Sequence, residues 1–490
     1  LVLNNQALKS DISAKSVRTS KSDASIDCIL LTQTKYKEAA ENLATWKRQT
    51  GQNVELIVKE NWLPSEVKST IHSIYDTSVP PPDYFLIVGD HEDVPGEIHY
   101  SPDDQDFSSD LYYACMNGPY DYTPDMAHGR LSVTTAEEAE IVVNKIINYE
   151  SNPPQDDAFY QQGSNCAQFQ DDELNGYATR RFAHTSEDIR NYMMEQDFDV
   201  ERIYYTDPNV TPTNYNNGWY SNGEPIPDEL LRDNGFQWNG GQADIIDAIN
   251  DGRFYLFHRD HGYAGGSGWA HPYFVKNSID YLENGPQLPV VFSINCHTGE
   301  FLLPNSFAEK FMRHPQGGAV GVFAASYYSY SGYNDGLSCG FIDAMFPEPG
   351  LIPEFGDGGI DNPNVSPHEK IMTMGDVLNQ GLIRMGETWG SNRYTNEIFH
   401  YFGDPAMKLR TSFEGEITAN NPDTIFYESQ GEVVLTDCSV SNSVATLVSN
   451  EKLLDSMMVE NGSATLTFDS LTGDYLLLTI SKDNHKPYID

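Results

Sequence analysis

The chain has 490 residues, with 30 Lys and Arg against 72 Asp and Glu, which gives a formal net charge of −42 at pH 7. Such a charge repels nucleic acid and anionic lipid, so we expect neither as a partner. The sequence contains no run of about 18 apolar residues, the length that a membrane span needs. The polar start of the chain lacks the basic head and apolar core of a signal peptide. The length is too great for one core, and we expect two to four domains.

The first two regions of the chain differ in composition. Residues 1–25 are polar, rich in Ser and Lys and without periodicity, and we interpret them as an arm or a propeptide remnant. In residues 26–150, short apolar runs alternate with amphipathic stretches, a pattern that predicts a parallel sheet covered by helices, here α/β subdomain A. The predicted strands are 26–31, 53–58, 84–88 and 129–133, and the predicted helices are 36–50, 64–75 and 135–149.

A linker at 151–157, rich in Pro and Asp, indicates a boundary. Residues 151–412 repeat the strand–helix pattern and predict a second α/β unit, catalytic subdomain B, in which the loop 206–239 has the length of a functional loop. Residues 413–490 show short alternating β segments and predict a small β-sandwich. In subdomain B, the predicted strands are 165–168, 201–205, 254–257, 288–294 and 319–326, and the predicted helices are 185–196, 241–250, 307–313 and 376–385.

Two reactive side chains follow two of these strands directly. His261 and Gly262 come after the strand at 254–257, and Cys296 comes after the strand at 288–294. The carboxyl ends of parallel strands are where α/β folds place their chemistry, so we expect the imidazole and the thiol at one edge of one sheet. A thiol nucleophile needs a proton carrier and oxyanion donors, which His261 and the N–H groups of Gly262 and Cys296 could supply. A helix predicted after Cys296 should add a favourable dipole.

A metal site is the main alternative chemistry for this region. Zinc would need three or four converging ligands, and the available side chains are His258, His261, His271, His297 and Cys296. No helical HExxH pattern is present, and His258 and His261 are predicted to lie in a loop, so thiol catalysis is favoured over a zinc hydrolase. A further hypothesis is a catalytically inactive protein that keeps the fold and uses its β-sandwich and acidic surface for binding or adhesion.

Ordered motifs along most of the chain are similar to those of one known family. They are ATWKRQTGQNVEL at 44–56, FLIVGDHEDVPG at 85–96, HGRLS at 128–132, TDPNVTP at 206–212, the HG and NCHTGEF pair, SFAEKFMR at 306–313, YFGDPAMKL at 401–409 and VENGSATLTFDSLTG in the β-sandwich. On these motifs the chain resembles the gingipain-type cysteine peptidases of the caspase-like clan. The resemblance implies a caspase-like catalytic domain of two α/β sheet subdomains, followed by a C-terminal immunoglobulin-like β-sandwich.

The resemblance also implies an activity and a setting. We expect a secreted or cell-surface, extracellular cysteine endopeptidase that arises from a zymogen, acts on protein or peptide substrates and is a monomer. No organic cofactor is expected. The family binds structural Ca²⁺, and Asp90 and Glu97, beside the GDH loop, match positions for its oxygen ligands.

The catalytic residues of the family are carried over position by position. Cys296 matches the nucleophile, His261 the catalytic histidine and Gly262 the glycine that follows it. The acidic residue that orients the histidine should fall just after the strand at 165–168, where this chain has Asp171 and Asp172. Counting along the chain from that strand favours Asp171.

The specificity pocket is where the chain departs from the family pattern. Gingipains that cut after Arg carry an aspartate upstream of the helix at 185–196, where this chain has ATRRFAH with Ala183 nearest that position, and a second pocket segment reads YYSYSGYND. If an Arg points inward, the substrate residue whose carbonyl is attacked, P1, should be acidic. Otherwise the tyrosines shape a neutral or aromatic pocket, and Asp335 could keep a basic P1. The predicted substrate-binding residues are Arg180, Arg181, His184, Tyr327, Tyr328, Ser329, Tyr330 and Asp335.

Overall fold

The computed structural model describes residues 25–216, 223–353, 359–423, 425, 430–469, 471 and 475–490. The predicted N-terminal arm, 1–25, lies outside these ranges except for its last residue, and so does the centre of the predicted loop 206–239. Within the described ranges, no helix is both long enough and apolar enough to cross a bilayer.

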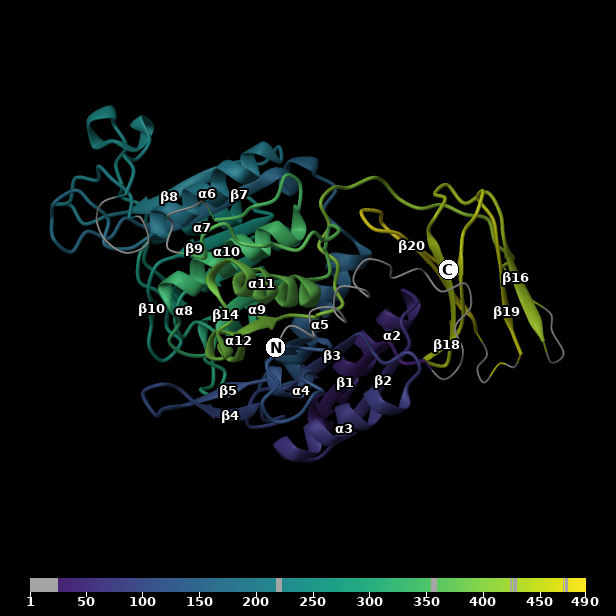
Figure 1. Cartoon of the computed structure of the whole chain (residues 1–490). Helices are drawn as coiled ribbons and strands as arrows, with labels where there is room; N and C mark the ends of the chain where they lie inside the picture. The colour runs from purple at the N-terminus through teal and green to yellow at the C-terminus, as the bar shows by residue number, and fades with distance from the viewer. Residues whose placement is uncertain are drawn as a thin grey trace.

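A ten-stranded sheet with the order β2-β1-β3-β6-β15-β14-β13-β9-β7-β8 forms the centre of the fold (Figure 1). Strands β2, β1, β3, β6 and β15 are parallel to one another and form what we call the first half-sheet. Strands β14, β13, β9, β7 and β8 are also parallel and form the second half-sheet. The bounds are β1 Cys28–Gln33, β2 Val54–Lys59, β3 Tyr84–Val88, β6 Ala127–Leu131, β7 Gln162–Gln168, β8 Asp199–Tyr205, β9 Tyr255–Arg259, β13 Val290–Ile294, β14 Gly321–Ala325 and β15 Phe399–Phe402.

The two half-sheets meet where β15 runs antiparallel to β14, with Phe323 opposite Tyr401. On its other side β15 is parallel to β6, with Phe402 opposite Arg130, so a strand from late in the chain joins the halves into one continuous sheet. Because the halves run in opposite directions, the carboxyl ends of their strands lie at opposite edges of the sheet. The predicted α/β class is confirmed.

Helices cover both faces of the sheet, as the alternation along β1 shows. Cys28 and Leu30 belong to the main core, which also contains side chains of α2 and α5, whereas Ile29 and Leu31 belong to a second core with side chains of α3. The α-helices are α2 Lys37–Gln49, α3 Pro64–Thr77, α4 Leu111–Ala114, α5 Ala136–Ser151, α6 Phe182–Glu195, α7 Gln242–Asn250, α8 Lys276–Ile279, α9 Phe307–Arg313, α10 Ser331–Met345, α11 Met374–Trp389 and α12 Arg393–Ile398. The 3₁₀ helices are Thr34–Tyr36, Asp157–Gln161, Asp228–Leu230 and Arg232–Asn234.

Helix α10 is absent from the sequence prediction because three glycines lower its intrinsic helix propensity. The structure shows what two of them permit. A Cβ on Gly340 would lie 2.8 Å from the carbonyl oxygen of Gly381 in α11, and a Cβ on Gly336 would lie 2.3 Å from Cδ1 of Trp389. The glycines therefore let α10 and α11 pack at a distance that larger residues would forbid.

Several small elements surround the main sheet. A hairpin of β4 (Glu97–Tyr100) and β5 (Asp106–Ser109) follows β3. After His261 the chain forms a three-stranded sheet of β10 (Gly262–Tyr263), β11 (Gly268–Trp269) and β12 (Phe274–Val275). These short strands begin three residues after the end of β9.

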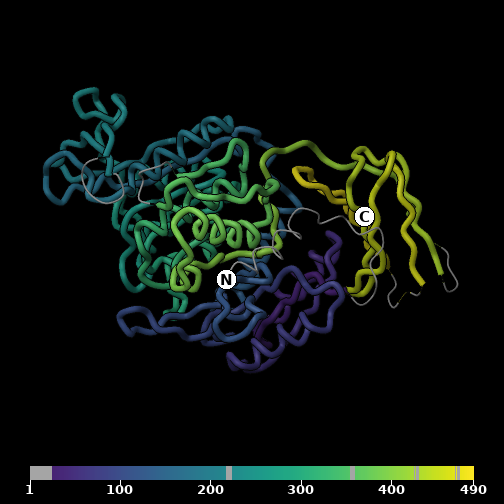
Figure 2. The backbone as a smooth tube through the Cα atoms, viewed as in Figure 1, coloured from purple at the N-terminus to yellow at the C-terminus, as the bar shows by residue number. Residues whose placement is uncertain are grey.

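The C-terminal part is the predicted β-sandwich, with one sheet of β16 and β19 and a second with the order β18-β17-β20-β21. It lies beside α2, at the end of the molecule away from β10 (Figures 1 and 2). A Cβ on Gly51, just after α2, would lie 3.1 Å from Oγ of Ser456, and Arg410 Nη1 donates to the carbonyl of His485 at 2.9 Å. The bounds are β16 Gly431–Leu435, β17 Val444–Ser449, β18 Lys452–Met458, β19 Ala464–Phe468, β20 Leu477–Ser481 and β21 Tyr488–Ile489.

Candidate active site

His261 and Cys296 line one cavity at the carboxyl edge of the second half-sheet. Their strands, β9 and β13, are parallel neighbours, with His258 opposite Ser293, so both chains leave the sheet at the same edge. The cavity has a volume of about 210 Å³. His261 is exposed and Cys296 is partly exposed, whereas the other five cysteines are buried. The structure thus gives the thiol and the imidazole access to one ligand.

The Cys296 thiol is held by the segment that follows β14. The Ser329 N–H donates to Sγ at 3.3 Å, and Sγ lies 3.6 Å from the Ser329 carbonyl oxygen. The prediction that a helix dipole acts on this thiol is wrong, because α9 begins only at Phe307, after a long irregular segment. A single backbone amide of a neighbouring loop takes its place.

A buried network fixes the turn that carries Cys296. Asn295 Nδ2 donates to His258 Nδ1 at 2.7 Å, and Thr298 Oγ1 donates to Asn295 Oδ1 at 2.8 Å. The His258 ring stacks on Trp269 at 4.2 Å, and its Nε2 donates to the carbonyl of His271 at 3.1 Å. The residue before the nucleophile is therefore tied to the strand that leads to His261.

This network also corrects the prediction that His258 lies in a loop. His258 lies in β9, both of its ring nitrogens are hydrogen-bonded, and burial lowers the pKa of its imidazole well below the usual value. His297 is bound through Nδ1 to Glu300 at 2.9 Å, and His271 stacks on Tyr205 at 4.6 Å. Among the residues that the structure describes, no three His, Cys, Asp or Glu side chains are arranged to hold a metal ion. The alternative of a zinc hydrolase gains no ligand cluster from this arrangement.

Gly262 brings the two catalytic segments into contact. A Cβ at this position would lie 1.9 Å from the Cys296 carbonyl oxygen and 2.7 Å from Asn295 Oδ1, so no other residue fits without moving the backbone. The N–H of Cys296 has no hydrogen-bond partner among the described residues. It is therefore available to a negative oxygen formed beside the thiol.

Gln170, which the sequence prediction missed, contacts the imidazole of His261. Its Oε1 lies 3.0 Å from His261 Nε2, and its Nε2 donates to the two carboxylate oxygens of Asp172 at 2.9 and 3.1 Å. The ring edge of His261 also meets Phe182, with the ring centroids 5.2 Å apart. Gln170 follows β7 in the same way that His261 follows β9, so its place at a strand end was the available signal.

The prediction that Asp171 orients His261 is wrong. The Asp171 carboxylate is buried and accepts the backbone N–H groups of Glu173, Asn175 and Gly176, at 3.1, 3.3 and 2.7 Å. It therefore closes its own turn. Asp172 meets Gln170 rather than the imidazole, so it acts on His261 only through that amide.

The predicted substrate-binding residues divide into two groups. Arg180, Ser329 and Tyr330 line the cavity, together with Phe182, Arg259, Asp260, Asn295, Ser331 and Asn334, which the sequence prediction did not include for this role. The other five predicted residues are placed elsewhere. Arg181 is buried and donates to the carbonyl of Asn216, His184 stacks on Tyr215, Tyr327 stacks on Phe107, and the Tyr328 carbonyl accepts from Tyr394.

The structure does not leave the Asp335 carboxylate open to a basic P1 side chain. Asp335 is buried, and its carboxylate lies 2.5 Å from Arg259 Nη2 and 3.5 Å from Arg181 Nε. Thr185 Oγ1 also donates to it at 2.9 Å. Two guanidinium groups already compensate this negative charge, so it is not open to a substrate cation.

The two predicted calcium ligands lie in a turn and in a short strand. Asp90 Oδ1 accepts the N–H groups of Glu92 and Asp93 and so closes its own turn. Glu97 lies in β4. Burial, and then the charge of Asp93, raises the pKa of Asp90 to about 6. Among the described residues no three His, Cys, Asp or Glu side chains are grouped as candidate ligands, so the calcium site stays a prediction.

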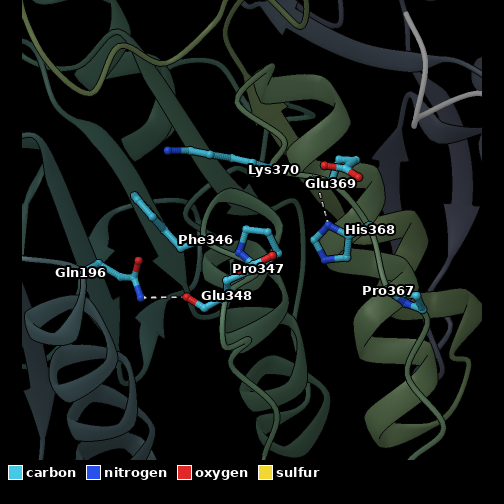
Figure 3. Close-up of a pocket in the computed structure, with 8 residues that line it drawn as sticks. All are labelled: Gln196, Phe346, Pro347, Glu348, Pro367, His368, Glu369 and Lys370. Carbon is cyan, nitrogen blue, oxygen red and sulfur yellow. Dashed lines mark hydrogen bonds between the residues drawn. The ribbon is translucent and has the colours of Figure 1, made fainter.

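A larger cavity, of about 580 Å³, lies at the other end of α10 (Figure 3). His368, on its wall, is tied by Nε2 to Asp343 at 2.9 Å, and Gln196 Nε2 donates to the carbonyl of Glu348 at 3.1 Å. No cysteine lines it. Cavity volume alone would therefore point away from the thiol and the imidazole.

Comparison with known proteins identifies the family. The model of peptidase family C25 matches residues 21–410, and the model of the C-terminal Ig-like domain of the same family matches residues 428–490. Together the two matches cover most of the chain, including His261, Cys296 and the β-sandwich.

Individual relatives come from Porphyromonas gingivalis. Gingipain R1 is 24% identical over 471 residues, covering 94% of this chain and 42% of the relative, and gingipain R2 is 24% identical over 463 residues, covering 92% and 55%. The chain thus spans about half the length of these relatives or less. The crystal structure of the Arg-specific cysteine proteinase gingipain R has a TM-score of 0.72 at 21% identity and covers 97% of this chain and 99% of its own.

Proposed function

The chain belongs to peptidase family C25, and from this premise we propose that it is a cysteine endopeptidase that hydrolyses peptide bonds in protein or peptide substrates. The observation that carries the proposal is the pairing of a partly exposed thiol and an exposed imidazole on one cavity, at the carboxyl ends of neighbouring parallel strands. A thiol and a proton carrier at such a place suit acyl transfer from an amide.

In the proposed reaction, His261 takes the proton of the Cys296 thiol as Sγ attacks the carbonyl carbon of the substrate. The carbonyl π electrons move onto oxygen, and the N–H groups of Cys296 and Gly262 stabilise the oxyanion. The carbon–nitrogen bond then breaks as His261 gives its proton to the nitrogen. An amine leaves, and a thioester remains on Cys296.

Hydrolysis of the thioester completes the cycle. A water molecule attacks the thioester carbon and gives its proton to His261, and the carbon–sulfur bond breaks. The sulfur recovers the proton from His261, and a carboxylic acid leaves. The buried network around Asn295 and His258 keeps the thiol in one place through both steps.

Gln170 sets the tautomer of the imidazole in this proposal. Because Asp172 accepts from the Gln170 amide nitrogen, the amide oxygen faces His261 Nε2. Nε2 then carries a hydrogen, and Nδ1 is the atom that takes and returns the catalytic proton. Gln170 is a positioning residue, since it acts through His261.

The proposal is tested with Cys296→Ala and a mixed peptide library. We expect the native chain to cleave peptides and the variant to lose cleavage by about 10⁴-fold or more, while its thermal unfolding temperature stays the same. A native chain that binds peptides or proteins without cleaving any would favour the alternative, a catalytically inactive gingipain-like binding or adhesion protein.

Three further parts of the proposal come from the family resemblance: an extracellular location, a monomeric state and bound structural calcium. A monomer predicts a mass of 54.9 kDa by light scattering. Calcium predicts that EDTA lowers the unfolding temperature and that added Ca²⁺ restores it. Detection of the protein in the cell-free fraction of a culture tests the location.

A further inference from the structure

The cavity beside Cys296 gathers positive charge in a chain whose net charge is −42. Arg180 and Arg259 both line it. Arg180 is exposed, and its guanidinium has no hydrogen bond or ion pair with any described residue. The chain has 72 Asp and Glu residues, yet Arg180 is paired with none of those that the structure describes. Its guanidinium is therefore available to a ligand beside the candidate nucleophile.

Arg259 presents a second guanidinium from inside the wall. It is 1% exposed, its Nη2 donates to Asp335 at 2.5 Å and to the Ser331 carbonyl at 2.6 Å, and the ring of Phe182 lies 4.8 Å from its Cζ. These contacts fix the plane of the group. Its Nη1 has no partner among the described residues. A fixed guanidinium with an unused nitrogen suits recognition of a carboxylate.

The carboxylates near the cavity do not cancel this charge. Asp335 is shared by Arg259 and Arg181, which also lies 3.8 Å from Asp188. Asp260 lines the cavity, but its Oδ2 accepts the His271 N–H at 2.7 Å, and burial raises the pKa of its carboxyl. The charge facing the cavity is therefore positive on balance.

Two helix N-termini add to the positive potential. Helix α6 begins at Phe182 and α10 at Ser331, and both residues line the cavity. Neither helix has an acidic residue in its first turn, and neither has a side-chain cap. Unpaired N–H groups at a helix start favour an anion, and here they stand beside two arginines.

We propose that this cavity binds the carboxylate of an acidic P1 side chain, Asp or Glu, in the substrate whose carbonyl Cys296 attacks. The inference rests on the proposed peptidase function and names its substrate class. Arg180 binds the carboxylate from the open side and Arg259 Nη1 from the wall. A cationic P1 side chain meets two guanidinium groups, and the one carboxylate in the lining, Asp260, is only 2% exposed.

The test compares peptides that differ only at P1. The pairs Glu against Gln and Asp against Asn keep shape and remove charge, and Arg reverses the charge. We expect the native chain to cleave the acidic peptides about 10- to 100-fold more efficiently in kcat/KM than the amide peptides, the range for a charge-assisted hydrogen bond. Added salt should lower the acidic rates more than the amide rates.

Variants assign the effect to the cavity. Arg180→Gln, at an exposed position, should lose about 10-fold or more on acidic peptides with little change on amide peptides, and Arg180→Lys should recover part of the loss. The matched control is Lys452→Gln, which removes one positive charge from an exposed position in β18 and should change neither rate.

The outcomes separate this inference from the proposed function. If peptides with Arg, Gln or Tyr at P1 are cleaved as well as those with Glu, and Cys296→Ala abolishes that cleavage, the peptidase stands and the acidic pocket is refuted. If no peptide is cleaved and the thiol resists alkylation, both are refuted. Equal loss on acidic and amide peptides in Arg180→Gln also overturns the role given to that residue.

Discussion

The two half-sheets have the same parallel architecture, but their polar groups have different partners. In the first half-sheet, the buried Arg130 in β6 forms a paired contact with Asp110, and Asp93 binds Tyr36 and Lys35. In the second half-sheet, His261 after β9 and Cys296 after β13 line a cavity. The same fold can place polar residues to hold the protein together or to meet a ligand.

The contacts of a polar group distinguish a functional site from a structural one within this repeated architecture. A polar group whose partners all belong to the protein is a structural group, even when it follows a strand. Three residues differ from these structural groups because each lines one cavity and is at least partly exposed: Cys296, His261 and Arg180. Substitutions in the two halves should therefore change different measured quantities, activity in one and stability in the other.

The largest effect is expected for His261→Ala in the second half-sheet. Loss of the proton carrier should lower kcat by about 10²- to 10⁴-fold, with the unfolding temperature unchanged because the ring is exposed. His91→Gln, after β3 in the first half-sheet, is the matched histidine. It should leave kcat unchanged and lower stability by about 1 kcal/mol, because His91 Nδ1 bonds to Ser108 at 2.9 Å. Similar kcat losses in both variants would contradict the comparison.

Asp110→Asn should produce the opposite pattern. It leaves the buried Arg130 charge without its carboxylate, which costs about 3–5 kcal/mol of unfolding free energy. The folded fraction should keep its kcat/KM. Asp106→Asn, at an exposed position of the preceding strand β5, is the control and should change stability by less than about 0.5 kcal/mol. Urea unfolding measures both, and a stable Asp110→Asn variant with low activity would break the assignment.

Buried histidines of the first half-sheet predict acid sensitivity. Burial lowers the pKa of His128 to about 3 and that of His400 to about 4, against 6.5 for the free group. Below pH 6.5 the unfolded chain binds these protons and the folded chain does not, so stability falls with pH until the folded pKa is reached. Each histidine contributes about 1.4 kcal/mol per pH unit.

His128→Phe tests this pH dependence. Both ring nitrogens of His128 are buried without partners, and the ring stacks on Phe85, so a phenyl ring suits the site. Urea unfolding from pH 7 to pH 5 should show a slope smaller by about 1.4 kcal/mol per unit in the variant. An unchanged slope would show that His128 is not the group that titrates on unfolding.

The smallest effect is expected for Gln170. Gln170→Ala should lower kcat by about 10-fold through loss of ring orientation. Gln170→Glu places a carboxylate on His261 Nε2, which raises the pKa of the imidazole. Because His261 must be unprotonated to take the thiol proton, the acid limb of the kcat/KM profile should move to higher pH. A purely structural role for Gln170 would lower activity without moving that limb.

The sequence predicted the strand-end positions well because short apolar runs in β9 and β13 are followed within a few residues by His-Gly and Asn-Cys. Gln170 was missed because a neutral amide stood where a carboxylate was sought. Arg259 was missed because it lies within β9, where only the structure shows that its guanidinium reaches the cavity. Strand β15 is four residues long, and its pairing with β6 and β14 is a long-range contact that no local pattern encodes.

The central claim is that Cys296 is the activated thiol of the second half-sheet. Its most direct measurement is alkylation of the native chain by iodoacetamide, followed by peptide mapping of all six cysteines. We expect rapid modification at Cys296, slower modification at that residue in His261→Ala, and protection of the five buried cysteines until the chain unfolds. Equal labelling of several cysteines, or an unmodified Cys296 in the folded protein, would contradict it.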